Sequence, residues 1–222
     1  MRKNMVLLSG GLDSVAALHL SLKRHGCENV AAIGFAYGQL HEKAELAAAL
    51  AIANRRNVSF EVVDIRATTA GFVPDPVPGL HRVTHISNAN IPARNAIMLS
   101  IAAARSAARW PGATIELVGG WNFDDKLGFP DCRPKFLKTM SEALALSLEG
   151  IASVSVLAPW SRWPKFQIVG WCKKSTQAAE DILESVSCYY GTTCQRCDAC
   201  KFRLTAFRLA EKDANFKAEV TA

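Results

Sequence analysis

Short apolar runs alternate along the chain with longer segments in which apolar residues recur every three or four positions. The short runs predict five strands, at residues 4–8, 30–36, 58–64, 114–119 and 152–157. The longer segments predict helices at about 14–25, 41–54, 92–109, 134–149 and 199–212. Gly26 is expected to close the first helix and Pro92 to lie in the first turn of the third. This alternation predicts an α/β fold with a parallel sheet covered by helices on both faces.

One long segment interrupts this pattern. Residues 66–91 contain Pro74, Pro76 and Pro78 together with several glycine, asparagine and threonine residues, which predicts a loop. Loops of that length within a compact domain are usually functional or mobile.

Size and composition fit one domain with a substantial core, since the chain has 222 residues and 50% of them are hydrophobic. No apolar run is long enough for a membrane span, and the apolar stretch after residues 1–4 is too short for a secretory signal. We therefore expect a cytoplasmic protein. The net charge is +6, but the basic residues form no block, so ATP suits the chain as an anionic partner as well as RNA does.

The first predicted strand runs into the string Ser9-Gly10-Gly11-Leu12-Asp13-Ser14, and a helix follows at once. Two glycines allow a tight turn and a close approach to a ligand, and their N–H groups form an anion site with the positive end of the helix. The serines add hydroxyl donors, and Asp13 can orient the loop or reach a magnesium ion. An ordinary strand-to-helix turn is the alternative. The string is not a Walker loop, because it lacks Gly-Lys-Ser/Thr.

Four of the seven cysteines cluster near the C-terminus in the spacing C-x5-C-x2-C-x2-C: Cys188, Cys194, Cys197 and Cys200. Without a secretory signal, such clustering favours a metal over disulfides. Four thiolates can close a tetrahedral site, so we predict one structural Zn²⁺ per chain, with an iron–sulfur cluster or free thiols as alternatives. The other three are expected to be buried or incidental thiols: Cys27, Cys132 and Cys172.

Three further strings follow predicted strands or begin predicted helices: Phe35–His41 (FAYGQLH), Ile91–Asn95 (IPARN) and Asp125–Pro134 (DKLGFPDCRP). In a doubly wound sheet, ligands bind at these carboxyl-end positions. We therefore expect the three strings to meet the SGGLDS loop around one site.

The SGGLDS loop resembles the pyrophosphate loop of the PP-loop ATP pyrophosphatases, which split ATP between its α and β phosphates. From about Met5 to Arg203, five motifs in order (SGGLDS, FAYGQLH, IPARN, GFPDCRP, and SCYYG with the three cysteines after it) closely resemble the 7-cyano-7-deazaguanine synthases, often called the QueC family. The resemblance implies a doubly wound, mostly parallel five-stranded sheet of the adenine-nucleotide α-hydrolase type, in strand order 3-2-1-4-5. It also implies a single PP-loop domain over residues 1–222, with a helical zinc-binding segment at 186–205.

The function that the resemblance implies belongs to queuosine biosynthesis. Such enzymes use ATP, with Mg²⁺, to convert 7-carboxy-7-deazaguanine and ammonia into 7-cyano-7-deazaguanine (preQ0) through an acyl-adenylate and an amide. By the family pattern, the ATP-binding residues are Leu8, Ser9, Gly10, Gly11, Leu12, Asp13 and Ser14. The same pattern makes the four clustered cysteines the zinc ligands.

Other assignments rest on chemical type. The candidate catalytic residues are Asp13, Lys165 and Arg133, with Lys165 neutralising the charge that develops as AMP leaves. The candidate substrate-binding residues are Tyr37, Gln39, Arg94, Asn95, Asp125, Phe129, Asp131 and Arg133. Arginines offer forked donors to carboxylate or phosphate, aspartates can accept the deazaguanine N–H groups or bind magnesium, and aromatic rings can stack on the base. The alternatives are capping or surface arginines, helix-cap or turn aspartates, a solvated lysine, core aromatics and, for His41, an exposed or capping histidine.

The chain departs from the family pattern at three places: Gln195 replaces a glycine, residues 158–167 lack the usual hydroxyl and acidic residue around Lys165, and Lys135 replaces an acidic residue. We expect these positions to lie near the active site. The alternative functions are therefore a related ligase that passes the adenylated carboxylate to an amine on a protein or nucleic acid, and a non-catalytic nucleotide-binding module. A tRNA-modifying PP-loop enzyme should carry an additional RNA-binding domain, and none is visible.

The expected small-molecule partners are ATP, ammonia and 7-carboxy-7-deazaguanine. A homodimer is also expected, with Trp160, Trp163 and Trp171 as exposed side chains for its contact.

Overall fold

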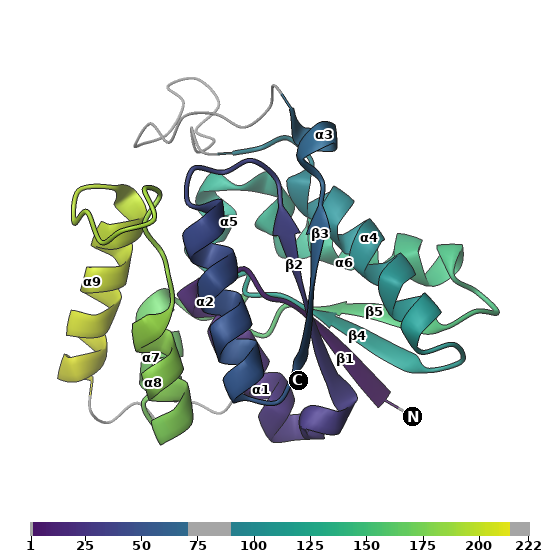
Figure 1. The fold of residues 1–222 in the computed structure, drawn as a ribbon, viewed down its shortest axis with the longest axis horizontal. Coiled ribbons are helices and arrows are strands. Elements are labelled where there is room, and N and C mark those ends of the chain that lie inside the picture. Colours follow the sequence, from purple (N-terminus) through teal and green to yellow (C-terminus); the bar gives the residue numbers. More distant parts are fainter. Residues whose placement is uncertain (1, 71–89, 214–222) are drawn as a thin grey trace.

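The computed structural model describes residues 2–70 and 90–213, and these contain one five-stranded parallel sheet (Figure 1). Its order is β3-β2-β1-β4-β5, as the family resemblance predicts. The strands are β1 (Arg2–Leu7), β2 (Val30–Ala36), β3 (Ser59–Asp64), β4 (Thr114–Val118) and β5 (Ser153–Leu157). The loops that follow β1 and β4 therefore diverge at the point where the strand order reverses, which is where α/β sheets bind ligands.

The five predicted helices are confirmed to within a few residues, as α1 (Leu12–His25), α2 (Glu42–Arg55), α4 (Arg94–Arg109), α6 (Pro134–Ser147) and α9 (Asp198–Lys212). The sequence pattern did not give bounds for six short elements: η1 (Cys27–Asn29), α3 (Arg66–Thr69), α5 (Asp125–Gly128), η2 (Pro130–Cys132), α7 (Lys165–Cys172) and α8 (Thr176–Glu184). None of the described helices is both long and apolar enough to cross a membrane.

Two buried clusters lie on opposite faces of the sheet. Alternate residues of β1 and β2 point to opposite sides. Val6 and Ala32 belong to a cluster with residues of α1, α2, α7, α8 and α9, whereas Met5 and Ile33 belong to a cluster with residues of α4 and α6. The α7–α9 segment thus covers the same face as α1 and α2 (Figure 1).

Two predictions need correction between β3 and α4. The segment predicted as a loop at 66–91 begins with helix α3, and its residues 71–89 lie outside the described part of the chain. Helix α4 begins at Arg94 rather than at Pro92, because Ala93 adopts the left-handed conformation with φ of 56°. Pro92 therefore precedes the helix, and Arg94 and Asn95 occupy its first turn.

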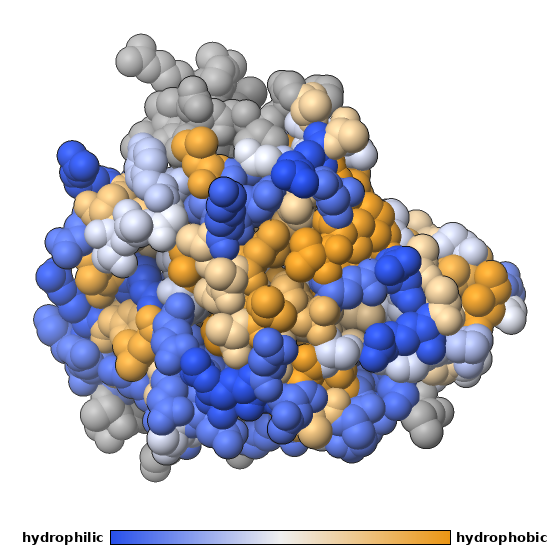
Figure 2. All heavy atoms as spheres, viewed as in Figure 1, coloured by the Kyte–Doolittle hydropathy of each residue, from blue (hydrophilic) through white to orange (hydrophobic). Residues whose placement is uncertain are grey.

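The three tryptophans expected at a dimer contact instead pack on one another, with Trp160 buried and Trp163 and Trp171 partly buried. Trp160 is fully buried, with ring centroids 5.6 Å from Trp163 and 5.3 Å from Trp171. The indole N–H of Trp160 also donates to the backbone oxygen of Asp13 over 3.2 Å. The cluster therefore fixes α7 against the start of α1. Apolar residues do gather on the surface over the edge strand β3 and helix α2 (Figure 2), where Val62 is 48% exposed.

Candidate active site

One cavity of about 340 Å³ opens at the carboxyl ends of the strands. Its walls come from the loop after β1, the loop after β2, the first turn of α4, the loop after β4, the start of α7 and the segment before α9. The three motif strings and the SGGLDS loop therefore meet at one site, as the sequence predicts.

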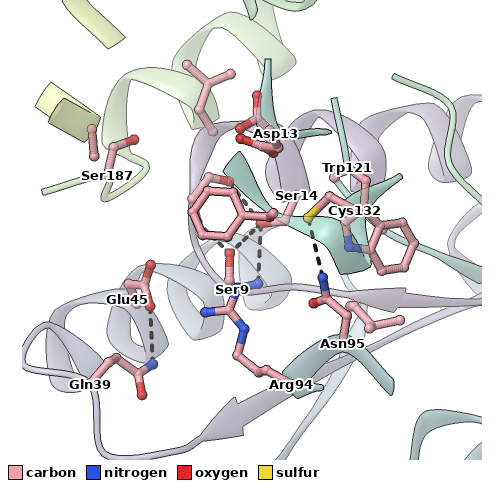
Figure 3. A pocket seen from close by; sticks show the side chains of 18 of the residues that line it. Ser9, Asp13, Ser14, Gln39, Glu45, Arg94, Asn95, Trp121, Cys132 and Ser187 are labelled. Carbon is pink, nitrogen blue, oxygen red and sulfur yellow. Dashed lines mark hydrogen bonds between the residues drawn. The ribbon is translucent and has the colours of Figure 1, made fainter. Parts of the chain in front are cut away.

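The loop after β1 is closed by hydrogen bonds among its own residues. Ser14 Oγ donates to the Gly11 oxygen over 2.9 Å and lies 3.1 Å from Ser9 Oγ, which accepts the Gly11 N–H (Figure 3). Gly10 has φ of 87°, and a Cβ there would lie 2.2 Å from the backbone oxygen of Glu45, so helix α2 packs directly on this turn. The loop is thereby held with its N–H groups at the head of α1.

The predicted ATP-binding residues do not all reach the cavity. Ser9, Gly11, Leu12, Asp13 and Ser14 line it. Leu8 is fully buried in the core, and the Gly10 oxygen accepts the Val186 N–H over 2.9 Å, so neither residue is among those lining the cavity. These two residues support the turn from behind.

Asp13 and Lys165 form an ion pair inside the cavity, with Asp13 Oδ2 2.9 Å from Lys165 Nζ. Asp13 Oδ1 is buried and has no hydrogen-bond partner in the described part of the chain. The Lys165 N–H donates to Asp124 Oδ2 over 2.9 Å, which fixes the start of α7 to the loop after β4. Burial lowers the pKa of Lys165, but the carboxylates of Asp13 and Asp125 more than reverse this, so Lys165 remains charged.

Asp125 lines the cavity beside this pair. Burial raises the pKa of Asp125 to about 6; the Lys165 charge opposes the rise, and the Asp13 carboxylate adds to it. Gly120 allows this close approach, since a Cβ there would lie 2.6 Å from the backbone of Asp13 and Ser14. The carboxylates of Asp13 and Asp125 and the ammonium of Lys165 thus face the space next to the SGGLDS loop.

Arg94 projects into the cavity, where it contacts Tyr37. Its Nη1 donates to the Tyr37 hydroxyl over 3.3 Å, and its guanidinium carbon lies 5.4 Å from the centre of the Tyr37 ring. Within residues 2–70 and 90–213, no carboxylate oxygen lies within 4.0 Å of it. A partly buried guanidinium that has no carboxylate partner within the described ranges favours an anionic ligand.

Asn95 is held in place from the loop after β4. Its backbone N–H donates to Asp131 Oδ2 over 3.1 Å, and its side-chain amide donates to the Asp131 oxygen and to Cys132 Sγ over 3.2 and 3.4 Å. Asn95, Cys132 and Phe129 line the cavity, but Asp131 does not. Asp131 therefore caps the first turn of α4, which is the alternative that the sequence left open, rather than reaching a ligand.

Arg133 also does not reach the cavity. It is exposed, and its Nε donates to the Lys126 oxygen over 3.2 Å. Lys135 is exposed on α6 and is likewise absent from the residues lining the cavity, contrary to our expectation for that departure. Helix α6 begins at Pro134 and carries its first side chains away from the site.

The four clustered cysteines come together. Their Sγ atoms all lie within 4.8 Å of one another, and the Cys194 and Cys200 sulfurs are 3.9 Å apart. A tetrahedron with metal–sulfur bonds of zinc length has edges of about 3.8 Å. Backbone N–H groups also donate to Sγ atoms, including that of Cys200 to Cys197 over 3.4 Å. The cluster can therefore hold a metal ion.

Gln195 stands where the family has a glycine, and it has φ of 58°. This is the left-handed region that favours glycine. The turn between Cys194 and Cys197 thus keeps a left-handed conformation, although Gln195 carries a side chain that makes this conformation strained.

Several cavity residues were not predicted. They are Glu45 from the first turns of α2, Trp121 from the loop after β4, and Ser187 and Tyr189 beside the first cluster cysteine. His41 Nδ1 lies 3.2 Å from the Tyr189 oxygen, which joins the cysteine segment to the cavity wall. Adjacency to Cys188 could have pointed to Ser187 and Tyr189, but no sequence signal singled out Glu45.

The family model described as queuosine biosynthesis protein QueC matches residues 3–211. The chain belongs to the QueC family. Curated relatives named 7-cyano-7-deazaguanine synthase include those of Brucella ovis, 36% identical over 95% of this chain and 91% of the relative, and of Rhizobium rhizogenes, 36% identical over 94% and 88%.

Among solved structures, the U34-tRNA thiolase NcsA from Methanococcus maripaludis, a protein with a [4Fe-4S] cluster, aligns with a TM-score of 0.50. The alignment covers 100% of this chain and 77% of the thiolase, with 16% sequence identity. At 16% identity, the similarity between the thiolase and this chain concerns the fold alone.

Proposed function

We propose that this chain is an ATP-dependent carbon–nitrogen ligase that converts 7-carboxy-7-deazaguanine and ammonia into 7-cyano-7-deazaguanine. Membership of the QueC family and relatives named for that synthase support the assignment. The structural observation that carries it is one cavity in which the SGGLDS loop, the Asp13–Lys165 pair and the Arg94 guanidinium face the same space. Such a cavity can bring two anions together, as the adenylation of a carboxylate requires.

The chemistry has two ATP-dependent stages. In the first, the substrate carboxylate attacks the α-phosphorus of ATP, pyrophosphate leaves, and ammonia then displaces AMP from the acyl-adenylate to give the amide. In the second, the amide oxygen attacks another ATP, and loss of AMP and protons from the adenylated amide gives the nitrile. Each stage consumes one ATP and releases AMP and pyrophosphate.

The residues of the SGGLDS loop bind the pyrophosphate part of ATP. The Ser9 and Ser14 hydroxyls and the N–H groups at the head of α1 hold the departing pyrophosphate. Lys165 stabilises the negative charge that develops on the α-phosphate, and Asp13 keeps its ammonium in position. Mg²⁺ bound with ATP would neutralise phosphate charge, and Asp13 Oδ1, which has no hydrogen-bond partner among the described residues, is a suitable ligand atom for it.

The remaining cavity residues suit the flat deazaguanine. Arg94 pairs with the carboxylate or with the phosphate that replaces it, since both are anions with two oxygens available to a forked donor. The aromatic rings of Tyr37, Trp121 and Phe129 offer stacking surfaces, and the Asp125 carboxyl can accept from the N–H groups of the base.

The cysteine cluster is assigned a structural zinc ion, bound by Cys188, Cys194, Cys197 and Cys200 in a closed tetrahedral site. The ion would hold the cavity-lining segment, including Tyr189, against α9. A single domain is proposed, with segment 186–205 as part of it. The homodimer stays a prediction, now without the tryptophan contact that motivated it.

A second candidate function is a ligase that delivers the adenylated carboxylate to an amine on a protein or nucleic acid. The departure at residues 158–167 favours it, since that segment contains Lys165. Packing explains part of the departure, because Trp160 is buried in the core and Lys165 still reaches the cavity.

Incubation with 7-carboxy-7-deazaguanine, ATP, Mg²⁺ and ammonium tests the proposal, with the products identified by mass spectrometry. We expect the nitrile, with AMP and pyrophosphate. An amide as the final product, or a mass adduct on an added protein or polynucleotide, supports the second candidate. Absence of AMP release contradicts both.

A further inference from the structure

Glu45 is a buried carboxylate in the cavity wall that the adenylation chemistry leaves without a role. It lies in the first turns of α2, and its side chain is 12% exposed. Glu45 Oε2 accepts a hydrogen bond from Gln39 Nε2 over 3.2 Å and lies 3.4 Å from His41 Nε2 (Figure 3). Glu45 Oε1 has no hydrogen-bond partner in the described part of the chain. One oxygen of this carboxylate is therefore left for a ligand.

Glu45 differs from the other two cavity carboxylates in its surroundings. Asp13 pairs directly with Lys165, and Asp125 lies in the field of the same ammonium. No lysine or arginine nitrogen of the described residues lies within 4.0 Å of Glu45; its neighbours within that distance are an amide and an imidazole. The Lys165 ammonium thus lies beside Asp13 and acts on Asp125, whereas no such cation contacts Glu45 among the described residues.

Near neutral pH, the Glu45 carboxyl group is present in both its protonated and its ionised form. Burial raises its pKa to about 7, while the Gln39 hydrogen bond and the Arg94 charge oppose the rise. The other titratable groups on this side of the cavity are His41, whose pKa burial lowers, and Tyr37, whose pKa burial raises. A carboxyl of this kind is available in both forms at neutral pH, which a general base requires.

The proposed reaction requires such a base. At neutral pH ammonia is mostly ammonium, which has no lone pair to attack an acyl carbon. A group in the cavity must therefore bind the cation and take one of its protons. A partly desolvated carboxylate with a free oxygen attracts ammonium and can accept the proton.

We propose that Glu45 receives the nitrogen donor as ammonium and is the general base of the amination step. This inference rests on the proposed function. One N–H proton moves to Glu45 Oε1, and the freed lone pair forms the C–N bond to the acyl carbon. The C–O bond to AMP breaks, AMP leaves with its electron pair, and a second N–H proton passes to water as the amide forms. Glu45 then releases its proton to solvent before the next turnover.

The test separates adenylation from amination in Glu45→Gln. Adenylation is measured as ATP–pyrophosphate exchange with 7-carboxy-7-deazaguanine in the absence of any amine. Amination is measured by rapid quench after ammonium is added to the preformed adenylate. Hydroxylamine, which is uncharged at neutral pH, is added in a parallel reaction, because it attacks without prior deprotonation. Glu42→Gln is the matched control: Glu42 lies one turn earlier on α2, and its accepted hydrogen bond from the Gly38 N–H survives the change to an amide.

We expect Glu45→Gln to exchange pyrophosphate, to form amide from ammonium roughly 10²–10⁴-fold more slowly than wild type, and to form hydroxamate at close to the wild-type rate. Glu42→Gln should match wild type in all three assays. Amide formation from ammonium at the wild-type rate would overturn the inference. So would an equal loss of exchange and hydroxamate formation, since Glu45 would then bind substrate or support the fold. If wild type itself shows no exchange, the proposed function fails and the inference falls with it.

Discussion

Lys165 Nζ lies 2.9 Å from Asp13 Oδ2, which joins the first residue of α7 to the first turn of α1 across the cavity. The two residues are far apart in the sequence, yet the Trp160 indole bonded to the Asp13 oxygen holds their helices together. The pair places a cation at the phosphate loop and supplies its counter-charge from the loop itself. This relationship accounts for an aspartate in a loop that we propose to bind phosphates.

Asp13→Ala should abolish AMP formation while leaving the metal bound. The substitution leaves the buried Lys165 ammonium without its partner and removes the proposed magnesium ligand, so AMP release should fall by roughly 10²-fold or more. Chromatographic measurement of AMP and elemental analysis of the purified variant check the two parts. Turnover at the wild-type rate would contradict the role given to Asp13.

Arg94→Met should weaken the use of the carboxylate substrate. A hydrogen-bonded charge contributes about 1.5–3 kcal/mol, so kcat/KM for 7-carboxy-7-deazaguanine should fall roughly 10- to 150-fold. Arg133→Met is the control, because Arg133 is exposed and does not line the cavity. Equal losses in the two variants would show that Arg94 has no special part in binding the anion.

Cys197→Ser should release the metal. A structural ion contributes to folding, and a loss of about 2–3 kcal/mol lowers the Tm of a chain of this size by roughly 5–10 °C. Elemental analysis and thermal unfolding measure the effect, with Cys27→Ser as the control because Cys27 is exposed and outside the cluster. Iron in place of zinc in the wild-type protein would support the alternative cluster.

Asp181 should control acid stability without affecting the cavity. It is fully buried, 2.8 Å from His19 Nε2, 2.8 Å from Arg55 Nη1 and 2.7 Å from Arg56 Nε. Burial alone would raise the pKa of Asp181, but the hydrogen bonds from His19 and Arg56 lower it to about 2, below its ordinary value of 3.8. Its contribution is therefore complete above about pH 4 and is lost as the pH falls through about 2.

Asp181→Ala should accordingly lower the free energy of unfolding by about 3–5 kcal/mol at neutral pH, because it removes the fully buried partner of the His19 side chain and of the largely buried Arg56 guanidinium. Urea unfolding at pH 7 and at acid pH measures the difference, which should shrink at the lowest pH. A pH-independent difference would mean that the carboxylate charge is not the source of the stability.

The fold was predictable because the strands and helices show clear hydrophobic periodicity and because the SGGLDS loop marks the first junction between a strand and a helix. The directions of individual side chains were less accessible. Asp131 and Arg133 lie two positions apart in one motif, yet one caps α4 and the other faces solvent, which depends on how η2 packs.

The cavity residues that the sequence missed share a physical cause. Glu45 belongs to an alanine-rich helix and reaches the cavity only because α2 packs on Gly10. The buried Trp160 was misjudged because nothing local distinguishes an aromatic ring that packs against the start of α1 from one on the surface. Such assignments depend on tertiary packing rather than on spacing.

The position of the triphosphate tests the account most directly. A crystal structure with an ATP analogue that cannot be cleaved between the α and β phosphates would locate it. The account predicts the β and γ phosphates within hydrogen-bond distance of the Gly11 and Asp13 N–H groups and the Ser9 and Ser14 hydroxyls, with the α-phosphate beside Lys165. A triphosphate bound elsewhere, with this turn empty, would contradict it.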